Sequence, residues 1–468
     1  MQNHSNFRLL VVRLGAMGDI LHALPAITAL RQTHPDWIID WVVEPHWQAL
    51  LSANQSSEPP ASVKGSIQRT LVEGTGFSPY IDPGKSTRAL APVKLTEKAP
   101  SVEDPGQLAS VKGTGFSPYI NPANSTWVLA PVKLTEKAPS VEDPGQLTSV
   151  KGTGFSPYIN PANSTRALAP EGENLAQPLI NHLHLAPTRI WRKAPFSRHT
   201  IHEINALRTA MRAAEYDAVI DLQGAIRSAV IARLACGKRL IGEAEPRERA
   251  ARWLFSERVP THSTHVIEQD IELASAIAGD QLAPVLPLLP IDPAAEAWAD
   301  EILPPTGHQP AVLINPGAGW GAKRWPAERY AAVAQSLIAN GCRILINVGP
   351  GEEPLAEIIV RQTAGAATPL VCSLAQLIAI TRRVSLAIAG DTGPLHLACA
   401  LSRPVVGIYG PTDPSRNGPF GTRFTVLRSP ESRRDHSRYE APEAGLLTIQ
   451  PDAVLRAANA LLYPETAL

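Results

Sequence analysis

The chain has 468 residues, of which 44% are hydrophobic, enough to form more than one domain core. Its 43 basic and 43 acidic residues give a formal net charge of +0, which argues against wholesale binding to nucleic acid. The four cysteines are far apart and form no CxxC pair, which predicts reduced thiols and no zinc site.

The N-terminus predicts neither a signal peptide nor a membrane span. The apolar run over residues 7–14 contains Arg8 and Arg13 and ends at Gly15. No run of about 20 apolar residues is present, which is the length that a spanning helix needs. We therefore expect a cytoplasmic protein, and a peripheral contact with the inner membrane is left open.

The first residues predict a βαβ unit of the doubly wound type. Residues 8–14 read as a buried parallel strand, and the turn GAMGD over residues 15–19 follows it. An apolar-periodic helix is expected over residues 20–32 and a second strand over residues 38–43.

A repeat with a period of 39 residues interrupts this pattern. The text GTGFSPYI occurs at Gly74, Gly113 and Gly152, and the repeat unit that starts at Gly152 is cut short. Each copy contains several prolines and no apolar face that could stack on a neighbour, so a solenoid is disfavoured. We expect residues 54–178 to be a disordered surface insertion. An ordered small domain or a docking arm is the alternative.

The α/β pattern resumes after the repeat. A strand is expected over residues 216–222 with a helix after Gly224, and a helix over residues 326–340. Four more strands are expected, each followed by a glycine-containing turn: residues 311–314, 343–348, 386–389 and 405–409. Ligands of open α/β sheets bind at such strand ends, where helix N-termini offer unpaired N–H groups. A C-terminal helix is expected over about residues 452–462, and it could cross back to the first half.

These elements predict an α/β protein with two Rossmann-like doubly wound domains facing a cleft. The first would comprise residues 1–53 and 179–290, and the second residues 291–468. The turns contain no complete GxGxxG fingerprint and no Walker A motif, so neither a dinucleotide enzyme nor a P-loop kinase is indicated. Taken alone, the glycine turns support only the binding of a phosphorylated ligand.

An ordered set of motifs resembles the ADP-heptose:lipopolysaccharide heptosyltransferases of glycosyltransferase family 9, most closely heptosyltransferase I. The matching segments are MGDILH at 17–22, DWVVE at 40–44, RIWRK at 189–193, YDAVIDLQG at 216–224, KRWP at 323–326, DTGPLH at 391–396 and YGPTDP at 409–414. They run in family order along essentially the whole chain outside the repeat, which the family does not ordinarily carry. The resemblance implies the GT-B fold, with no metal and no cofactor.

The implied reaction is inverting transfer of L-glycero-D-manno-heptose from ADP-heptose to a Kdo sugar of the lipid A inner core. A hydroxyl is a poor nucleophile, so a base must take its proton as it attacks the anomeric carbon. The resemblance assigns this role to Asp19, a carboxylate beside glycines at the start of a predicted helix. Taken alone, the turn fits a helix N-cap somewhat better than a base.

The donor site implied by the resemblance lies in the second half. Lys323 matches the phosphate-binding lysine of the family, and Asp391 matches a residue that contacts the donor sugar. Thr392 and Gly393 begin a helix whose N–H groups can hold phosphate oxygens. His396 lies one turn further on and is a donor candidate, although a packing role is the alternative.

Two further pairs belong to the predicted donor site. Glu352 and Glu353 follow a glycine turn, and one of them could hold the ribose hydroxyls; the sequence does not choose between them. Ala318 and Gly319 stand where the family has paired threonines, so donor contacts there would come from backbone groups.

The acceptor is expected to be an anionic glycolipid, bound by the first half. The candidates for contacting it are Gly18, His22, Arg189, Arg192, Lys193 and Gln223. The three basic side chains fit carboxylates and phosphates, although a solvated basic loop is the alternative. Asp221, at the same strand end as Gln223, could orient sugars. Residues 247–258 could form an amphipathic helix on the membrane or an ordinary surface helix.

Three alternatives stay open at this point. Heptosyltransferase II or another family 9 transferase is the alternative within the class. A non-catalytic protein, disabled by its insertion, is the alternative outside it, although the retained Asp19, Lys323 and Asp391 argue against this. A sugar-nucleotide epimerase would need acids and histidines in a different arrangement.

Overall fold

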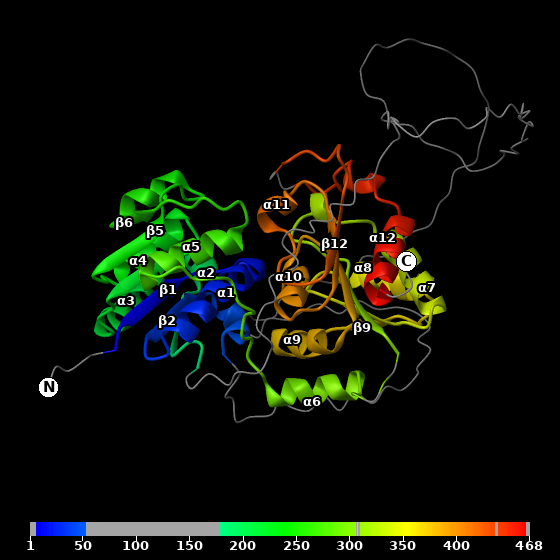
Figure 1. The fold of residues 1–468 in the computed structure, drawn as a ribbon, viewed down its shortest axis with the longest axis horizontal. Helices are drawn as coiled ribbons and strands as arrows, with labels where there is room; N and C mark the ends of the chain where they lie inside the picture. Colours follow the sequence, from blue (N-terminus) through cyan, green and yellow to red (C-terminus); the bar gives the residue numbers. More distant parts are fainter. Residues whose placement is uncertain (1–5, 53–177, 306, 308, 436–438, 465–468) are drawn as a thin grey trace, which may run out of the picture. The chain divides into compact units, whose positions relative to one another are not determined.

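The computed structural model describes residues 6–52, 178–305, 307, 309–435 and 439–464 (Figure 1). The predicted repeat insertion lies outside these residues except for its last position. Its expected disorder therefore stays a prediction.

The first half holds six strands, five α-helices and two 3-10 helices among the described residues. They are, in chain order, β1 Arg8–Val12, α1 Met17–Thr33, β2 Ile38–Val43, η1 Pro45–Leu50, β3 His182–Leu185, α2 Thr188–Trp191, α3 Arg198–Ala213, β4 Ala218–Asp221, α4 Ile226–Leu234, β5 Arg239–Glu243, η2 Arg249–Leu254, β6 Glu257–Val259 and α5 Val266–Ala278.

The second half repeats the alternation of strand and helix. Its elements are α6 Pro293–Ile302, β7 Ala311–Asn315, η3 Gly321–Lys323, α7 Ala327–Ala339, β8 Arg343–Asn347, α8 Glu353–Gln362, β9 Thr368–Leu370, α9 Leu374–Arg383, β10 Leu386–Gly390, α10 Gly393–Ala400, β11 Val405–Tyr409, α11 Pro414–Asn417, β12 Phe424–Arg428, η4 Leu446–Thr448 and α12 Pro451–Leu462.

Each half contains one six-stranded sheet, and the two sheets have the same topology. The first has the order β3-β2-β1-β4-β5-β6 and the second β12-β11-β10-β7-β8-β9. All pairings in both sheets are parallel. Both orders place the first strand of the half beside its second and fourth, which is the doubly wound order. The predicted fold class is confirmed.

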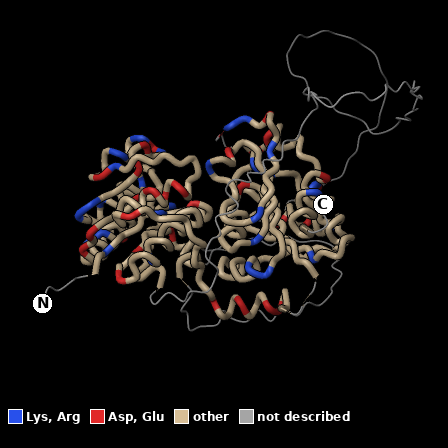
Figure 2. The backbone as a smooth tube through the Cα atoms, in the orientation of Figure 1, with Lys and Arg blue, Asp and Glu red and all other residues tan. Residues whose placement is uncertain are grey.

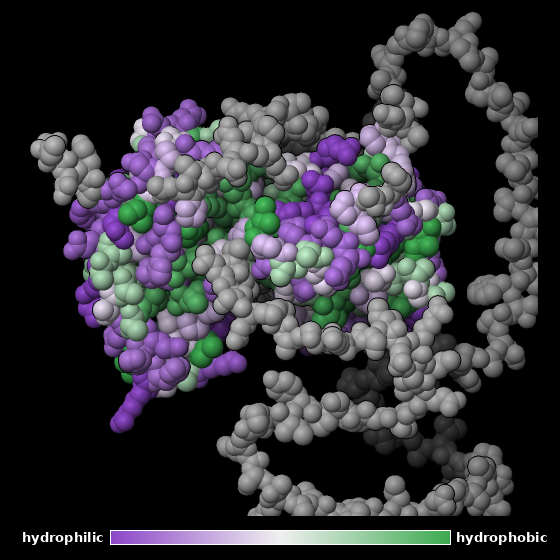
Figure 3. All heavy atoms as spheres, turned by 90° about the horizontal axis from the view of Figure 1, so that it is seen from below, coloured by the Kyte–Doolittle hydropathy of each residue, from purple (hydrophilic) through white to green (hydrophobic). Residues whose placement is uncertain are grey.

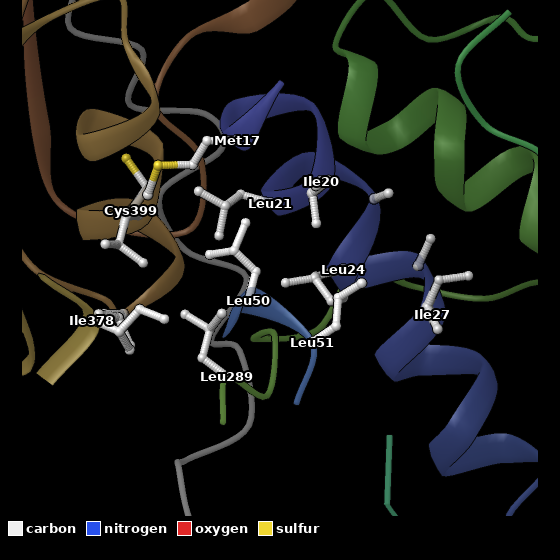
Figure 4. Packing of buried hydrophobic residues seen from close by; sticks show 14 of the residues in the cluster. Met17, Ile20, Leu21, Leu24, Ile27, Leu50, Leu51, Leu289, Ile378 and Cys399 are labelled. Carbon is white, nitrogen blue, oxygen red and sulfur yellow. The ribbon is translucent and has the colours of Figure 1, made fainter. Parts of the chain in front are cut away.

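The central strands are mostly apolar because helices cover both faces of a parallel sheet. Every residue of β7 and of β10 is buried. Helix α1 is also buried along most of its length, and Figure 4 shows Ile20, Leu21 and Leu24 of this helix among Leu50, Leu51 and Leu289. Asp19, the predicted base, lies in the first turn of α1. The packing of this helix therefore holds the backbone of Asp19 in a fixed position.

A buried arginine connects the segments on either side of the repeat. Arg31, near the end of α1, is fully buried, and its guanidinium donates to the carbonyl of Trp37 at 2.6 Å and to Asn181 Oδ1 at 2.6 Å. Asn181 Oδ1 also accepts the N–H of Ile39 at 2.8 Å. These bonds join the start of β2 to the residues that lead into β3.

One expected helix is absent, and one helix that is present packs elsewhere than expected. Residues 247–258 form the short η2 and the strand β6 instead of an amphipathic helix, because the Arg239 guanidinium pairs with Glu257 at 2.7 Å and β6 pairs with β5. The C-terminal helix α12 does not cross back; its buried residues join the core of the second half, where it packs on α7.

The surface carries mixed charge. Acidic and basic residues are interspersed along the tube in Figure 2, in keeping with the balanced composition. In Figure 3, hydrophobic and hydrophilic residues alternate in small areas over the face shown. Among the described residues, no helix combines the length and apolar character needed to cross a membrane.

Candidate active site

Asp19 lies in the first turn of α1, directly after the loop that leaves β1. Its Oδ2 accepts the N–H of Ala16 at 3.0 Å, and its Oδ1 lies 3.6 Å from the guanidinium of Arg13. The side chain is 36% exposed. The carboxylate is therefore held in place at the helix start and remains accessible to a substrate.

The loop before Asp19 is fastened from the end of β4. Gln223 Oε1 accepts the N–H of Leu14 at 2.9 Å, so the predicted acceptor contact uses its carbonyl oxygen to shape the loop. Asp221 Oδ1 accepts the N–H groups of Gln223 and Gly224 at 2.8 and 2.9 Å. Asp221 is 1% exposed, and burial raises its pKa to about 6. It therefore shapes the turn and has no surface with which to orient a sugar.

Lys323 and Asp391 form a buried ion pair in the second half. The ammonium of Lys323, on η3, contacts Asp391 Oδ2 after the end of β10, and it lies 4.3 Å from the ring centroid of Trp320. Burial opposes ionisation of Asp391, but the hydrogen bond from His396 and the charge of Lys323 outweigh it and hold the pKa of Asp391 well below its usual range. Asp391 is thus a carboxylate at neutral pH.

Two histidines extend this pair to helix α1. His396 Nε2 lies 3.2 Å from Asp391 Oδ1, and His22 Nε2 lies 3.1 Å from His396 Nδ1. Burial, followed by the charges of His396, His265 and Arg13, lowers the pKa of His22 well below its usual range, so His22 is neutral. Because the carboxylate can only accept, His396 donates from Nε2 to Asp391. His22 lies one turn after Asp19, so the donor-site residues connect to the helix that carries the predicted base.

Glycines allow the starts of α1 and α10 to approach. A Cβ on Gly18 would lie 2.9 Å from the ring of His396, and one on Gly393 would lie 2.7 Å from Met17 Sδ. Gly18 is thus explained by a close approach inside the protein. Thr392, at the N-cap of α10, donates its hydroxyl to the Gly390 carbonyl at 3.2 Å.

The structure distinguishes Glu352 from Glu353, the two candidates for the contact with the ribose hydroxyls. Glu352 is half-buried and accepts the N–H of Gly349 at 3.1 Å, whereas Glu353 is exposed at the start of α8. Burial raises the pKa of Glu352. A Cβ on Gly317 would lie 1.8 Å from Glu352 Oε1, so this carboxyl lies directly over the loop that follows β7. In that loop Ala318 is buried, and a Cβ on Gly319 would meet open space.

Gly317→Ala tests the position of Glu352. The added methyl group must displace the carboxyl, so we expect the KM for the sugar nucleotide to rise about tenfold, which is the usual scale for the loss of one charge-assisted hydrogen bond. Steady-state kinetics would measure this, with Gly319→Ala as the control, because that position is open. An unchanged KM in Gly317→Ala would contradict a nucleotide contact by Glu352.

The basic residues of the predicted acceptor site lie together on and after α2. Arg189, Arg192 and Lys193 are all exposed. Glu44, which follows β2 and is 4% exposed, accepts the N–H of Arg189 at 3.2 Å and the hydroxyl of Thr188. Glu44 ends the motif DWVVE but has no predicted role; the sequence signal for it is a carboxylate directly after a buried strand.

Glu44→Gln is expected to raise the KM for the acceptor about three- to tenfold with little change in kcat, because the buried Glu44 carboxylate accepts the N–H of Arg189 and would act on the acceptor only through that predicted contact. Arg189→Ala should have a similar effect on the acceptor KM. Glu203→Gln is the matched control, since Glu203 binds Trp191 of the same helix and not Arg189. Equal effects of Glu44→Gln on the donor and acceptor KM values would indicate general disorder of the first half instead.

Comparison with known proteins gives one consistent result. The model of "Glycosyltransferase family 9 (heptosyltransferase)" matches residues 204–446. Lipopolysaccharide heptosyltransferase 1 of Escherichia coli K12 is 30% identical over 277 residues, which are 58% of this chain and 82% of that protein. Lipopolysaccharide heptosyltransferase 2 of the same strain is 31% identical over 172 residues, which are 35% of this chain and 49% of that protein.

Solved structures agree on the fold. E. coli heptosyltransferase WaaC with ADP matches with a TM-score of 0.60 at 21% identity, covering 97% of this chain and 100% of that chain. A family 9 glycosyltransferase from Veillonella parvula matches with a TM-score of 0.61 at 17% identity, covering 98% of each chain. The fold is thus GT-B, and the family model makes the protein a glycosyltransferase. The chain belongs to glycosyltransferase family 9 and is a heptosyltransferase.

Proposed function

We propose that this enzyme transfers L-glycero-D-manno-heptose from ADP-heptose to Kdo of the lipopolysaccharide inner core, with inversion at the anomeric carbon. The observation that carries the proposal is the accessible carboxylate of Asp19 on α1, connected through His22 and His396 to the Asp391–Lys323 pair. The motifs that resemble those of family 9 heptosyltransferases support the donor and acceptor classes.

In the proposed mechanism Asp19 is the general base. The acceptor hydroxyl attacks the anomeric carbon, its proton passes to Asp19, and the bond from that carbon to the β-phosphate oxygen breaks. ADP leaves with the electron pair of the broken bond. The N–H of Ala16 holds the carboxylate of Asp19 in one orientation, which avoids the cost of ordering it during the reaction.

Lys323 and the start of α10 stabilise the leaving diphosphate. Its negative charge increases as the bond breaks, and a buried ammonium is most effective against charge that develops in the transition state. The first N–H groups of a helix have no partner within the helix, so those of Thr392 and Gly393 are suited to phosphate oxygens. Asp391 positions Lys323 and, with His396, faces the donor sugar. Glu352 is the carboxylate proposed for the ribose hydroxyls.

The acceptor is proposed to bind the first half, with its anionic groups at Arg189, Arg192 and Lys193. A cytoplasmic enzyme that meets its glycolipid at the inner membrane fits this arrangement. Within the family we favour the heptosyltransferase I reaction over that of heptosyltransferase II, because RIWRK and KRWP resemble the first. A degenerate protein is disfavoured because the sequence retains Asp19, Lys323 and Asp391.

The test is ADP release from ADP-heptose with Kdo2-lipid A, with the same acceptor already carrying one heptose, and without acceptor. We expect release only with Kdo2-lipid A. Release only with the heptosylated acceptor would move the assignment to heptosyltransferase II. Binding of ADP-heptose without release under any condition would favour the degenerate protein.

A further inference from the structure

A buried arginine lies between Asp19 and a second carboxylate that the proposed mechanism does not use. Arg13 follows β1 and is 5% exposed. Its Nη2 lies 3.6 Å from Asp19 Oδ1, and its Nη1 lies 3.9 Å from Asp270 Oδ1. Asp270 belongs to α5, which packs on α1. One guanidinium thus faces two carboxylates with its two terminal nitrogens.

Burial of the Asp270 carboxyl has a high free-energy cost. Asp270 is 2% exposed, and its Oδ2 has no hydrogen-bond partner in the described part of the chain. A buried carboxyl with one unfilled oxygen destabilises the fold relative to an apolar residue of similar size. Packing alone therefore gives no reason for an aspartate at this position, whereas an electrostatic role toward Arg13 does.

The charges around Asp270 come from several elements. Burial raises its pKa to about 7; Arg13 opposes this rise, Asp19 and Glu243 of β5 add to it, and Arg416 of α11 opposes it. The charged residues of β6 have other partners: Glu257 pairs with Arg239, and Arg258 donates to the Arg252 carbonyl.

We propose that Asp270 is a positioning residue for Asp19 and acts through Arg13. The inference rests on the proposed function, which takes Asp19 as the base. When Asp270 is ionised, it shares the charge of Arg13 and holds the guanidinium between the two carboxylates. When Asp270 is neutral, Arg13 acts on Asp19 alone, stabilises its carboxylate form and weakens it as a base.

A pH dependence of kcat follows because Asp19 and Asp270 both interact with the charge of Arg13. Asp270 loses its proton as the pH rises through about 7, so the wild-type kcat should increase between pH 6 and pH 8. We expect this rise in kcat to be roughly two- to fivefold, a small part of the effect of a general base. In Asp270→Asn the rise is expected to disappear, and kcat should keep the lower value at both pH values.

Three variants separate this role from a structural one. Asp270→Glu keeps an ionisable group and should retain a rise in kcat, displaced in pH. Glu268→Gln removes a carboxylate from the preceding turn of α5 and should leave the wild-type profile unchanged. A lower kcat in Asp270→Asn with the wild-type profile shape would overturn the proposal, as would a wild-type kcat that is flat across pH 7.

A second measurement does not need turnover. The ¹³C carboxyl resonance of Asp19, assigned by its absence in Asp19→Asn, should show an inflection near pH 7 in the wild type and none in Asp270→Asn. If no acceptor supports ADP release, the proposed function fails, and this titration still decides whether Asp270 acts on Asp19. A resonance without that inflection in the wild type would overturn the inference while the proposed function stands.

Discussion

Asp19→Asn is expected to lower kcat about 10²- to 10⁴-fold, the range typical for removal of a general base. The amide oxygen can still accept the N–H of Ala16, so the start of α1 should keep its conformation. The amide cannot take the proton of the attacking hydroxyl, so the KM for ADP-heptose should stay close to that of the wild type. ADP release at saturating acceptor measures the effect.

The control for this experiment is Asp280→Asn, which changes an exposed aspartate beyond the end of α5. Its kcat should equal that of the wild type, and the unfolding midpoints of all three proteins should agree. If Asp19→Asn kept more than about a tenth of the wild-type kcat, a different group would have to accept the proton, and Asp19 would act only at the helix start.

Lys323→Met should produce the second large effect. It removes the ammonium while keeping a long apolar side chain, and it leaves Asp391 buried beside His396 without its cation. We expect kcat/KM for ADP-heptose to fall about 10²- to 10³-fold, the scale found when one group that stabilises transition-state charge is lost. Calorimetric titration with ADP should show binding at least tenfold weaker.

Lys238→Met is the matched control, because Lys238 also pairs with an aspartate, Asp217, at 2.7 Å but on the exposed surface of the first half. An exposed pair contributes little to stability, so this variant should keep wild-type kinetics. Unchanged ADP affinity in Lys323→Met would show that the diphosphate is bound elsewhere and that Lys323 serves only to balance Asp391.

Much of the fold could be predicted from the sequence because the signals are local. The strand followed by a glycine turn recurs at β1, β7, β8, β10 and β11, and all these strands lie within the predicted ranges or extend them by one residue. The prediction of a helix over residues 247–258 is wrong. Their mixed periodicity is compatible with a helix, but the pairing of β6 with β5 determines their conformation.

The site was less accessible to sequence reasoning because its contacts join distant positions. His22 and His396 are 374 residues apart, and nothing in either motif indicates that their rings meet. The choice between Glu352 and Glu353 needed the direction in which each carboxyl points. Asp270 belongs to none of the sequence motifs. Only its burial beside Arg13 identifies it as a candidate positioning residue.

The bonds of Arg31 and Asn181 bear on how the length of the repeat can change between strains. Near-identical repeats in a gene are prone to slippage during replication, so the number of 39-residue copies is expected to differ between strains. Arg31 and Asn181 bond the chain on both sides of the repeat to the same end of β2, so gain or loss of a whole copy leaves those bonds in place. Selection on the enzyme would then tolerate alleles of several lengths, and sequencing of related isolates should find them.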